Sequence, residues 1–343
     1  MVVPGSIPII IFSDLIAVLL AIPKSNQLNN QKRVWYKILQ VTIVLLAFLF
    51  LYSKLKEDFS WQFLEEINQP ELLVWILLLL PVNSGLEAVK WWKLTRSFSK
   101  QSFGKAFQSI LLGSFYTLFT PNRIGDGAGR VQMLPSGNKS RGTFAFINGS
   151  MSQFLCTVVF GGFALAIIQQ WYSPLDSEWW PFAQWVRWPI WIGTILLLLL
   201  YIEPGWVTMA KDLTKEESWI GKRVRTLQQY SRRQNAGTLF LSAFRYAVFA
   251  TQFYFALKLF GLDGSTFEIY LRIGILYLAT TLIPTVALAE LGVRESFAIL
   301  LFPAAGISEE GAMAATFLLW IVNLLIPALV GGLLFLKTKP ARS

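Results

Sequence analysis

The chain has 343 residues, of which 54% are hydrophobic and 15% are charged, and its formal net charge is +10. This composition is too apolar for an ordinary soluble domain and indicates a helical protein with several membrane spans. Histidine is absent, which excludes histidine acid–base chemistry, histidine metal sites and phosphohistidine intermediates. The single cysteine, Cys156, excludes a disulfide within the chain.

The N-terminal segment leaves several interpretations open. The apolar run from 7 to 22 carries Asp14 and is short for a span, so it could be a short span, a surface-lying helix or the product of an upstream start codon. It is a poor signal peptide because no basic residue precedes the apolar core. We therefore divide the chain into an N-terminal hydrophobic segment with a basic loop (1–35), a membrane domain (36–337) and a tail (338–343).

Charges at the ends of the apolar segments predict the orientation of the spans. Basic residues precede the span 38–53, and the loop after it holds two lysines against five acidic residues, so the first crossing runs outward from the cytoplasm. We expect the protein in the inner membrane of a bacterial cell, and the same rule places its C-terminus on the cytoplasmic side. Since the basic residues gather at segment ends, we expect no nucleic-acid partner. Further spans are expected at 72–92, 142–170, 189–201, 238–260 and 311–336.

The stretch 117–130, TLFTPNRIGDGAGR, interrupts this pattern. The apolar run 107–119 is shorter than the ~20 residues that a span needs, and Pro121 pushes the residue before it out of the α region. Three alternating glycines allow φ values that are closed to other residues. Basic residues on both flanks are typical of the cytoplasmic side, so we predict two short helices that enter from the cytoplasm and return.

The pattern recurs near the other end of the chain. The apolar run 269–283 is short, Pro284 breaks it, charged residues follow, and 296–303 is apolar again. Acidic flanks indicate that this second pair enters from outside. Two broken helices of opposite entry are typical of inverted repeats, which place a transport site near the membrane midplane. The expected fold is all-α, with about six or seven spans and two re-entrant pairs. Two unrelated proline-kinked spans are the alternative.

The charged residues of these breaks suit a lipid headgroup. A guanidinium group matches phosphate oxygens in a bidentate way, so we assign the arginines to phosphate. The carboxylates would hold the arginines when the site is empty, or would meet an amino headgroup. Glu87 would be a counter-ion or a proton carrier. The candidate substrate-binding residues are Glu87, Pro121, Asn122, Arg123, Gly125, Asp126, Arg130, Pro284, Glu290, Gly292, Arg294 and Glu295.

Each of these residues also has a structural interpretation. Arginine–carboxylate pairs inside helix bundles often only lock the fold. Glu87 and Lys90 would then extend their charged ends to the cytoplasmic interface. Arg245 and Arg272, close to the ends of predicted spans, would be interfacial anchors. We expect no catalytic residue, no metal site and no cofactor.

Three segments resemble the lysylphosphatidylglycerol synthase transmembrane family: LEAVKWWKL (86–94), GSFYTLFTPNRIGDGAGR (113–130) and PTVALAELGVRE (284–295). The likeness covers roughly residues 38 to 336. It implies a flippase-like membrane protein whose charged re-entrant loops meet a phospholipid or polyprenyl-linked headgroup. Synthase members of the family carry a soluble aminoacyl-transferase domain after the membrane part. This sequence shows no such domain, so we expect that it does not make the aminoacyl lipid by itself.

The sequence therefore favours a lipid flippase or transporter over an enzyme, with membrane lipid as its partner. A membrane-embedded transferase acting on a lipid-linked substrate is one alternative, although its usual cluster of carboxylates is missing. A non-catalytic partner of a separate synthase or glycosyltransferase is another. Assembly as a homo-oligomer stays open.

Overall fold

The computed structural model describes residues 38, 42, 67, 69–118, 120, 124–171, 180–203, 230–283 and 287–337. The predicted N-terminal segment, most of the predicted first span and the C-terminal tail lie outside the described residues, as do Pro121, Asn122, Arg123 and Pro284.

The described residues are helical throughout and contain no strand, as the sequence predicts. A π-helical turn, Ile321–Leu325, joins α13 to α14. The α-helices are α3 (Glu71–Thr95), α4 (Phe103–Thr117), α5 (Ile124–Gln132), α6 (Lys139–Trp171), α7 (Trp180–Ile202), α10 (Arg232–Leu259), α11 (Thr266–Leu282), α12 (Ala287–Leu301), α13 (Glu309–Trp320) and α14 (Ile326–Lys337).

Serine residues set several of the helix starts, because a serine oxygen satisfies backbone N–H groups that have no partner in the first turn. Ser102 accepts from the backbone of Lys105 at the start of α4, and Ser308 accepts from Gly311 at the start of α13. Ser231 and Gln234 form a reciprocal capping box at the start of α10.

Three helical stretches are long and apolar enough to cross a membrane, judged by length and composition: Glu71–Thr95, Ser136–Ile168 and Glu309–Lys337. Their mean hydropathies are 1.9, 2.0 and 2.3, and they coincide with the spans predicted at 72–92, 142–170 and 311–336. Apolar side chains on the outer faces of α3 and α7 are exposed, as expected where lipid replaces water: Val74, Trp75, Leu78, Ile195, Leu196 and Leu199. These features are those of a helical membrane protein.

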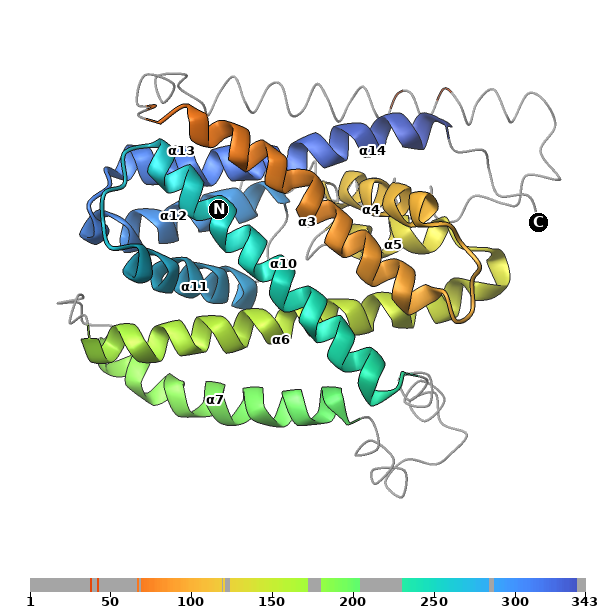
Figure 1. Cartoon of the computed structure of the whole chain (residues 1–343), viewed down its shortest axis with the longest axis horizontal. Coiled ribbons are helices and arrows are strands. Elements are labelled where there is room, and N and C mark those ends of the chain that lie inside the picture. Colours follow the sequence, from red (N-terminus) through yellow and green to blue (C-terminus); the bar gives the residue numbers. More distant parts are fainter. Residues whose placement is uncertain are drawn as a thin grey trace, which may run out of the picture.

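The two pairs of short helices lie on opposite sides of the middle of the molecule (Figure 1). The pair α4–α5 packs against α14, and the pair α11–α12 packs against α6 and α13. Helices α3 and α10 pack against each other and run between the two pairs in this view. The long helices therefore hold the two short pairs around a common centre.

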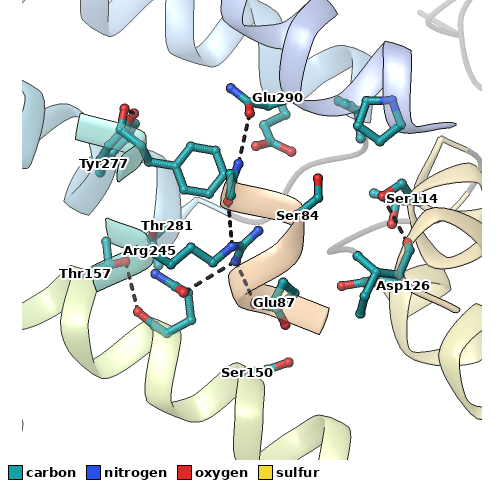
Figure 2. Close-up of a pocket in the computed structure, with 18 of the residues that line it drawn as sticks. Ser84, Glu87, Ser114, Asp126, Ser150, Thr157, Arg245, Tyr277, Thr281 and Glu290 are labelled. Atoms are coloured by element: carbon teal, nitrogen blue, oxygen red, sulfur yellow. Dashed lines mark hydrogen bonds and ion pairs between the residues drawn. The ribbon is translucent and has the colours of Figure 1, made fainter. Parts of the chain in front are cut away.

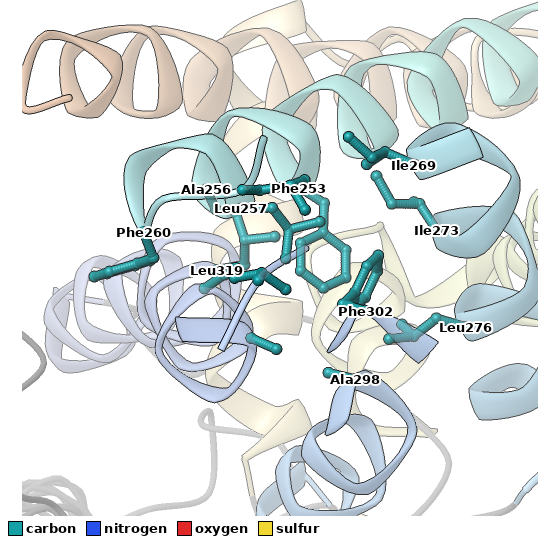
Figure 3. Close-up of a cluster of buried hydrophobic side chains, with 14 of the residues drawn as sticks. Phe253, Ala256, Leu257, Phe260, Ile269, Ile273, Leu276, Ala298, Phe302 and Leu319 are labelled. Carbon is teal, nitrogen blue, oxygen red and sulfur yellow. The ribbon is translucent and has the colours of Figure 1, made fainter. Parts of the chain in front are cut away.

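The largest hydrophobic core joins α10 to the α11–α12 pair and to α13 (Figure 3). Phe253 and Phe302 are 1% and 0% exposed, and their rings meet edge to face with centroids 5.5 Å apart. Ile273, Leu276 and Leu319 fill the space around them. Lipid tails are as apolar as these side chains, so the hydrophobic effect does not drive helices together within a membrane. Close packing of this kind stabilises their association instead. This core therefore holds the α11–α12 pair against α10 and α13.

The glycines near the first break serve close packing instead of unusual backbone angles. Gly125, Gly127 and Gly129 are all helical, and in the described chain only Gly261 and Gly306 have positive φ. A Cβ on Gly129 would lie 2.6 Å from backbone atoms of Gly113. The expectation of unusual φ values in this stretch is wrong; the absent side chains let α5 lie directly on α4.

Candidate functional site

A cavity of about 610 Å³ lies between the two pairs of short helices. Its wall takes residues from α3, α4, α5, α6, α10, α11, α12 and the α13–α14 segment. In Figure 2, Asp126 lies to the right of Arg245, Tyr277 lies to its left and Glu290 lies above it. The two stretches singled out in the sequence therefore contribute to one site.

Glu87 of α3 is the centre of the charge network. Its side chain is 6% exposed and faces three cations: Arg130 at 2.6 Å, Lys90 at 2.8 Å and Arg245 at 3.1 Å. Lys90 lies three residues further along the same helix, so both heads point the same way. The cations come from α3, α5 and α10, so one carboxylate links three helices. A buried carboxylate is tolerated only with such partners.

Arg130 pairs with two carboxylates through all three of its guanidinium nitrogens. Its Nε donates to Asp126 Oδ1 at 2.7 Å, its Nη2 forms an ion pair with Asp126 Oδ2, and its Nη1 donates to Glu87. The guanidinium also lies 5.4 Å from the ring centroid of Phe146. Arg130 and Asp126 are four residues apart on α5, so the helix itself sets this bidentate geometry.

Arg245 of α10 extends the network across the cavity. Besides Glu87, it donates to Asn83 Oδ1 at 2.8 Å and to Gln153 Oε1 at 3.4 Å. Its guanidinium lies 4.9 Å from the ring centroid of Phe249, a cation–π distance. Arg245 thus joins α10 to α3 and α6 and presents a cation to the cavity.

A chain of amide side chains continues from this point to the π-helical turn. Asn83 donates to Asn323 at 2.9 Å, Asn323 donates to Gln252 at 2.9 Å, and Gln252 donates to the backbone oxygen of Ile76 at 2.8 Å. Asn323 lies within the π-helical turn, a feature that occurs often at functional sites. The turn places an amide in the wall of the cavity where the flanking helices carry apolar side chains.

The second helix pair supplies a more open ion pair. Arg294 Nη2 donates to Glu290 Oε1 at 2.6 Å, and the two side chains are 22% and 14% exposed. The Arg294 guanidinium lies 6.0 Å from the ring centroid of Tyr277. Its Nε is buried and has no hydrogen-bond partner among the described residues. Arg294 therefore lines the cavity, while its unpaired Nε is shielded from it.

The structure brings together five of the predicted site residues in the cavity wall: Glu87, Asp126, Arg130, Glu290 and Arg294. Gly125 is buried next to it, where its N–H donates to Thr120 at 2.7 Å. Gly292 and Glu295 do not line the cavity. Arg123, Asn122, Pro121 and Pro284 lie outside the described residues, so their assignment stays a prediction.

Two structural interpretations from the sequence are wrong. Glu87 and Lys90 do not reach an interface, because they are 4% and 2% exposed and Lys90 also donates to Gly149 and Ser242. Arg272 is no interfacial anchor, because it is 3% exposed and pairs with Glu268 inside the protein.

Arg245 is a charged residue of the cavity wall that the sequence analysis did not assign to the site. Its position near the end of a predicted span favours an interfacial anchor, and no charged partner stands near it in sequence. Its partners Asn83 and Gln153 are far away along the chain. A cation inside an apolar span is itself a signal of a functional or paired site, and this signal was available.

The fold and the charged cavity define a helical membrane protein with a polar site enclosed between its helices. The family model for the lysylphosphatidylglycerol synthase TM region matches residues 37–331, and the chain belongs to this family. A search of curated proteins finds no significant match. In the described part of the chain, no group of three or more His, Cys, Asp or Glu residues could hold a metal ion.

Proposed function

We propose that this protein is a lipid flippase or transporter that passes a phospholipid or lipid-linked headgroup through the cavity. The observation that carries the proposal is the meeting of both charged helix pairs in one cavity around Glu87. Charges within a membrane protein normally face such a cavity and mark the path of a polar substrate. The membership of a lipid-related membrane family supports the same function.

The lengths of the paired helices support a re-entrant arrangement. Helices α4, α5, α11 and α12 have 15, 9, 17 and 15 residues. At ~1.5 Å per residue each is shorter than the ~30 Å hydrocarbon core of a bilayer. Short helices broken in the membrane are tolerated where the break lines a cavity. Two such pairs on either side of α3 and α10 are what an inverted repeat with a central site requires.

The size of the cavity suits a headgroup. Its volume of about 610 Å³ falls within the range of small-molecule sites. A whole phospholipid would not fit, so the acyl chains would stay in the surrounding lipid while the headgroup crosses.

The test is translocation in vesicles that contain the purified full chain and a fluorescent phospholipid. A membrane-impermeant reductant bleaches only outer-leaflet label, so bleaching beyond the outer-leaflet share reports movement. We expect this in vesicles with wild-type protein and not in protein-free vesicles. Arg294→Gln and Arg123→Gln should lose it. Lys258→Gln should keep it, because Lys258 pairs with the exposed Asp263 and does not line the cavity.

The main alternative is a membrane partner of a separate enzyme. Wild-type protein that moves no lipid but retains a synthase or transferase during mild purification would support that alternative. Turnover of a lipid-linked donor by the purified chain would support a transferase.

A further inference from the structure

We propose that the protein bends at two linked breaks, one inside α3 and one between α13 and α14, and that this bending opens and closes the cavity. The inference rests on the proposed function, which needs a site that a headgroup can enter and leave, and it names the moving parts. It follows from the positions of Pro81 and of the π-helical turn Ile321–Leu325, from the bond between them and from the two cores that they separate.

Two separate hydrophobic cores hold the two pairs of short helices. The first core, shown in Figure 3, joins α10, α11, α12 and α13. The second core joins the end of α3 to α4 and to the end of α5, through buried residues such as Trp91, Ala106 and Ile110 and the partly buried Val131. Close-packed cores resist deformation, so each is expected to move as one body.

Helix α3 passes from the first core to the second. Ile76 belongs to the first core, and Trp91 belongs to the second. Pro81 lies between them inside the helix. It has no N–H to donate to the carbonyl of Leu77, and its ring presses against that carbonyl, so the helix is weakened and kinked there. The Pro81 side chain is exposed, so little packing resists a change of bend at this point.

The segment 309–337 passes between the same two bodies. Helix α13 contributes Ala312 and Ala315 to the first core. Helix α14 packs against α4, where the ring centroids of Phe335 and Phe115 are 5.5 Å apart. The π-helical turn lies between these contacts, and it interrupts the α-helical hydrogen-bond pattern. Turns of this kind are a recognised cause of helix kinks and are frequent at functional sites.

The two breaks are joined by a hydrogen bond. Asn83, two residues after Pro81, donates to Asn323 in the π-helical turn at 2.9 Å. Both amides line the cavity, so the breaks lie at the level of the site and a change of bend at one moves the other. Asn83 also accepts from Arg245 at 2.8 Å. A headgroup that contacts Arg245 therefore acts on the joint and can favour one bend over the other.

Helix α6 is the fixed side of the molecule in this arrangement. It runs from Lys139 to Trp171 without proline and packs against both α5 and α11. Figure 1 shows α6 on one side of the molecule and α13 with α14 on the other. Bending is therefore expected to widen and narrow the cavity on the α13–α14 side, where Leu324 and Pro327 line its wall. Rocking of one helix group against another is how broken-helix transporters expose a central site.

The direct test is the distance between spin labels on the two bodies, measured by pulsed electron spin resonance on the full chain in lipid nanodiscs. Leu300→Cys in α12 and Leu333→Cys in α14 carry the labels, because both side chains are 56% exposed. Cys156→Ala removes the native thiol. The matched control combines Leu300→Cys with Met313→Cys in α13, since α12 and α13 belong to the same body.

We expect more than one distance between Leu300→Cys and Leu333→Cys, and a single distance for the control pair. Adding Pro81→Ala should restore the backbone donor and leave one distance between the two bodies. A single narrow distance for both pairs in the protein without Pro81→Ala overturns the inference.

The functional test is lipid translocation in vesicles by Pro81→Ala. Alanine favours the helix where proline weakens it, so one bend should be stabilised at the expense of the other, and translocation should slow about tenfold or more without a decrease in Tm. Pro189→Ala is the matched control, because Pro189 is an exposed proline inside α7 that does not line the cavity. It should leave translocation unchanged. Equal rates for Pro81→Ala and the wild type overturn the inference, as does a decrease in Tm that accounts for the lost translocation.

The two tests together separate this inference from the proposed function. If Pro81→Ala removes one of two distances but wild-type protein moves no lipid, the transport proposal fails and the joint stands. If wild-type protein moves lipid while the two bodies keep a single distance, the joint fails and transport stands.

Discussion

Replacing Glu87 with glutamine should strongly destabilise the protein. The substitution preserves the shape of the side chain but removes the one negative charge that Arg130, Lys90 and Arg245 share at 2.6, 2.8 and 3.1 Å. Lys90 and Arg130 are 2% and 6% exposed, so water cannot replace the lost partner. The variant therefore leaves three neighbouring cations with Asp126, at Arg130, as the carboxylate that still offsets their repulsion.

The size of the effect follows from the burial. At an effective dielectric constant of ~20, one unit pair at about 4 Å contributes roughly 4 kcal/mol before desolvation is subtracted. Because desolvation opposes much of this, breaking a buried pair costs about 3–5 kcal/mol. For domains of about 150–250 residues each kcal/mol changes the Tm by about 2–4 °C, so a decrease of roughly 10 °C is expected.

The assay is thermal unfolding of the purified protein in detergent at a fixed heating rate, since unfolding of a membrane protein is commonly irreversible. Glu71→Gln is the matched control, because Glu71 is an exposed glutamate in the first turn of the same helix. Adding Lys90→Met to Glu87→Gln should restore part of the loss, since it removes one unpaired cation. A Tm for Glu87→Gln equal to that of Glu71→Gln would refute the reasoning.

Three further predictions concern the scaffold and the cavity. Gly129→Ala should lower the Tm by several degrees, because its Cβ would lie 2.6 Å from Gly113, whereas Gly137→Ala, with open space around it, should not; equal Tm values would contradict the packing argument. Arg272→Gln should lower the Tm through the loss of its bonds to Glu268 and Leu301 but should leave lipid translocation unchanged, because Arg272 is not in the cavity wall; slower translocation would be evidence against that separation. Asn323→Leu should slow lipid translocation strongly and lower the Tm only slightly, because it breaks the link from Asn83 to Gln252 and places an apolar group in the cavity wall; unchanged translocation would show that this link is dispensable.

The all-helical fold could be predicted because each signal lies within a short segment. Apolar length and flanking charge predict the helices of 71–95, 139–171 and 309–337. Short helices on both sides of Pro121 and Pro284 were also predicted, because proline and short apolar runs are local features, while their re-entry into the membrane stays a prediction. The other predicted spans and the inverted repeat stay predictions.

The site could be predicted only in part, because its partners are distant in sequence. The pairs Asp126–Arg130 and Glu290–Arg294 are four residues apart, so helical spacing alone brings them together. The contacts of Glu87 with Arg130 and Arg245 join segments that no local pattern relates. The π-helical turn that places Asn323 in the wall has no sequence signal of its own.

The two helix pairs contribute different chemistry to the cavity, although their charged residues are similar. Arg130 is held by two carboxylates and is buried, so exchanging Asp126 for a lipid phosphate would take from that carboxylate the arginine that it holds with both oxygens. Arg294 has one carboxylate partner, a side chain that is 22% exposed and a donor without a partner among the described residues. A ligand that binds Arg294 competes with the Glu290 ion pair and leaves the network of Glu87 intact. The first pair therefore stabilises the arrangement of α3, α5 and α10, and the second pair is where we expect a ligand to bind and leave.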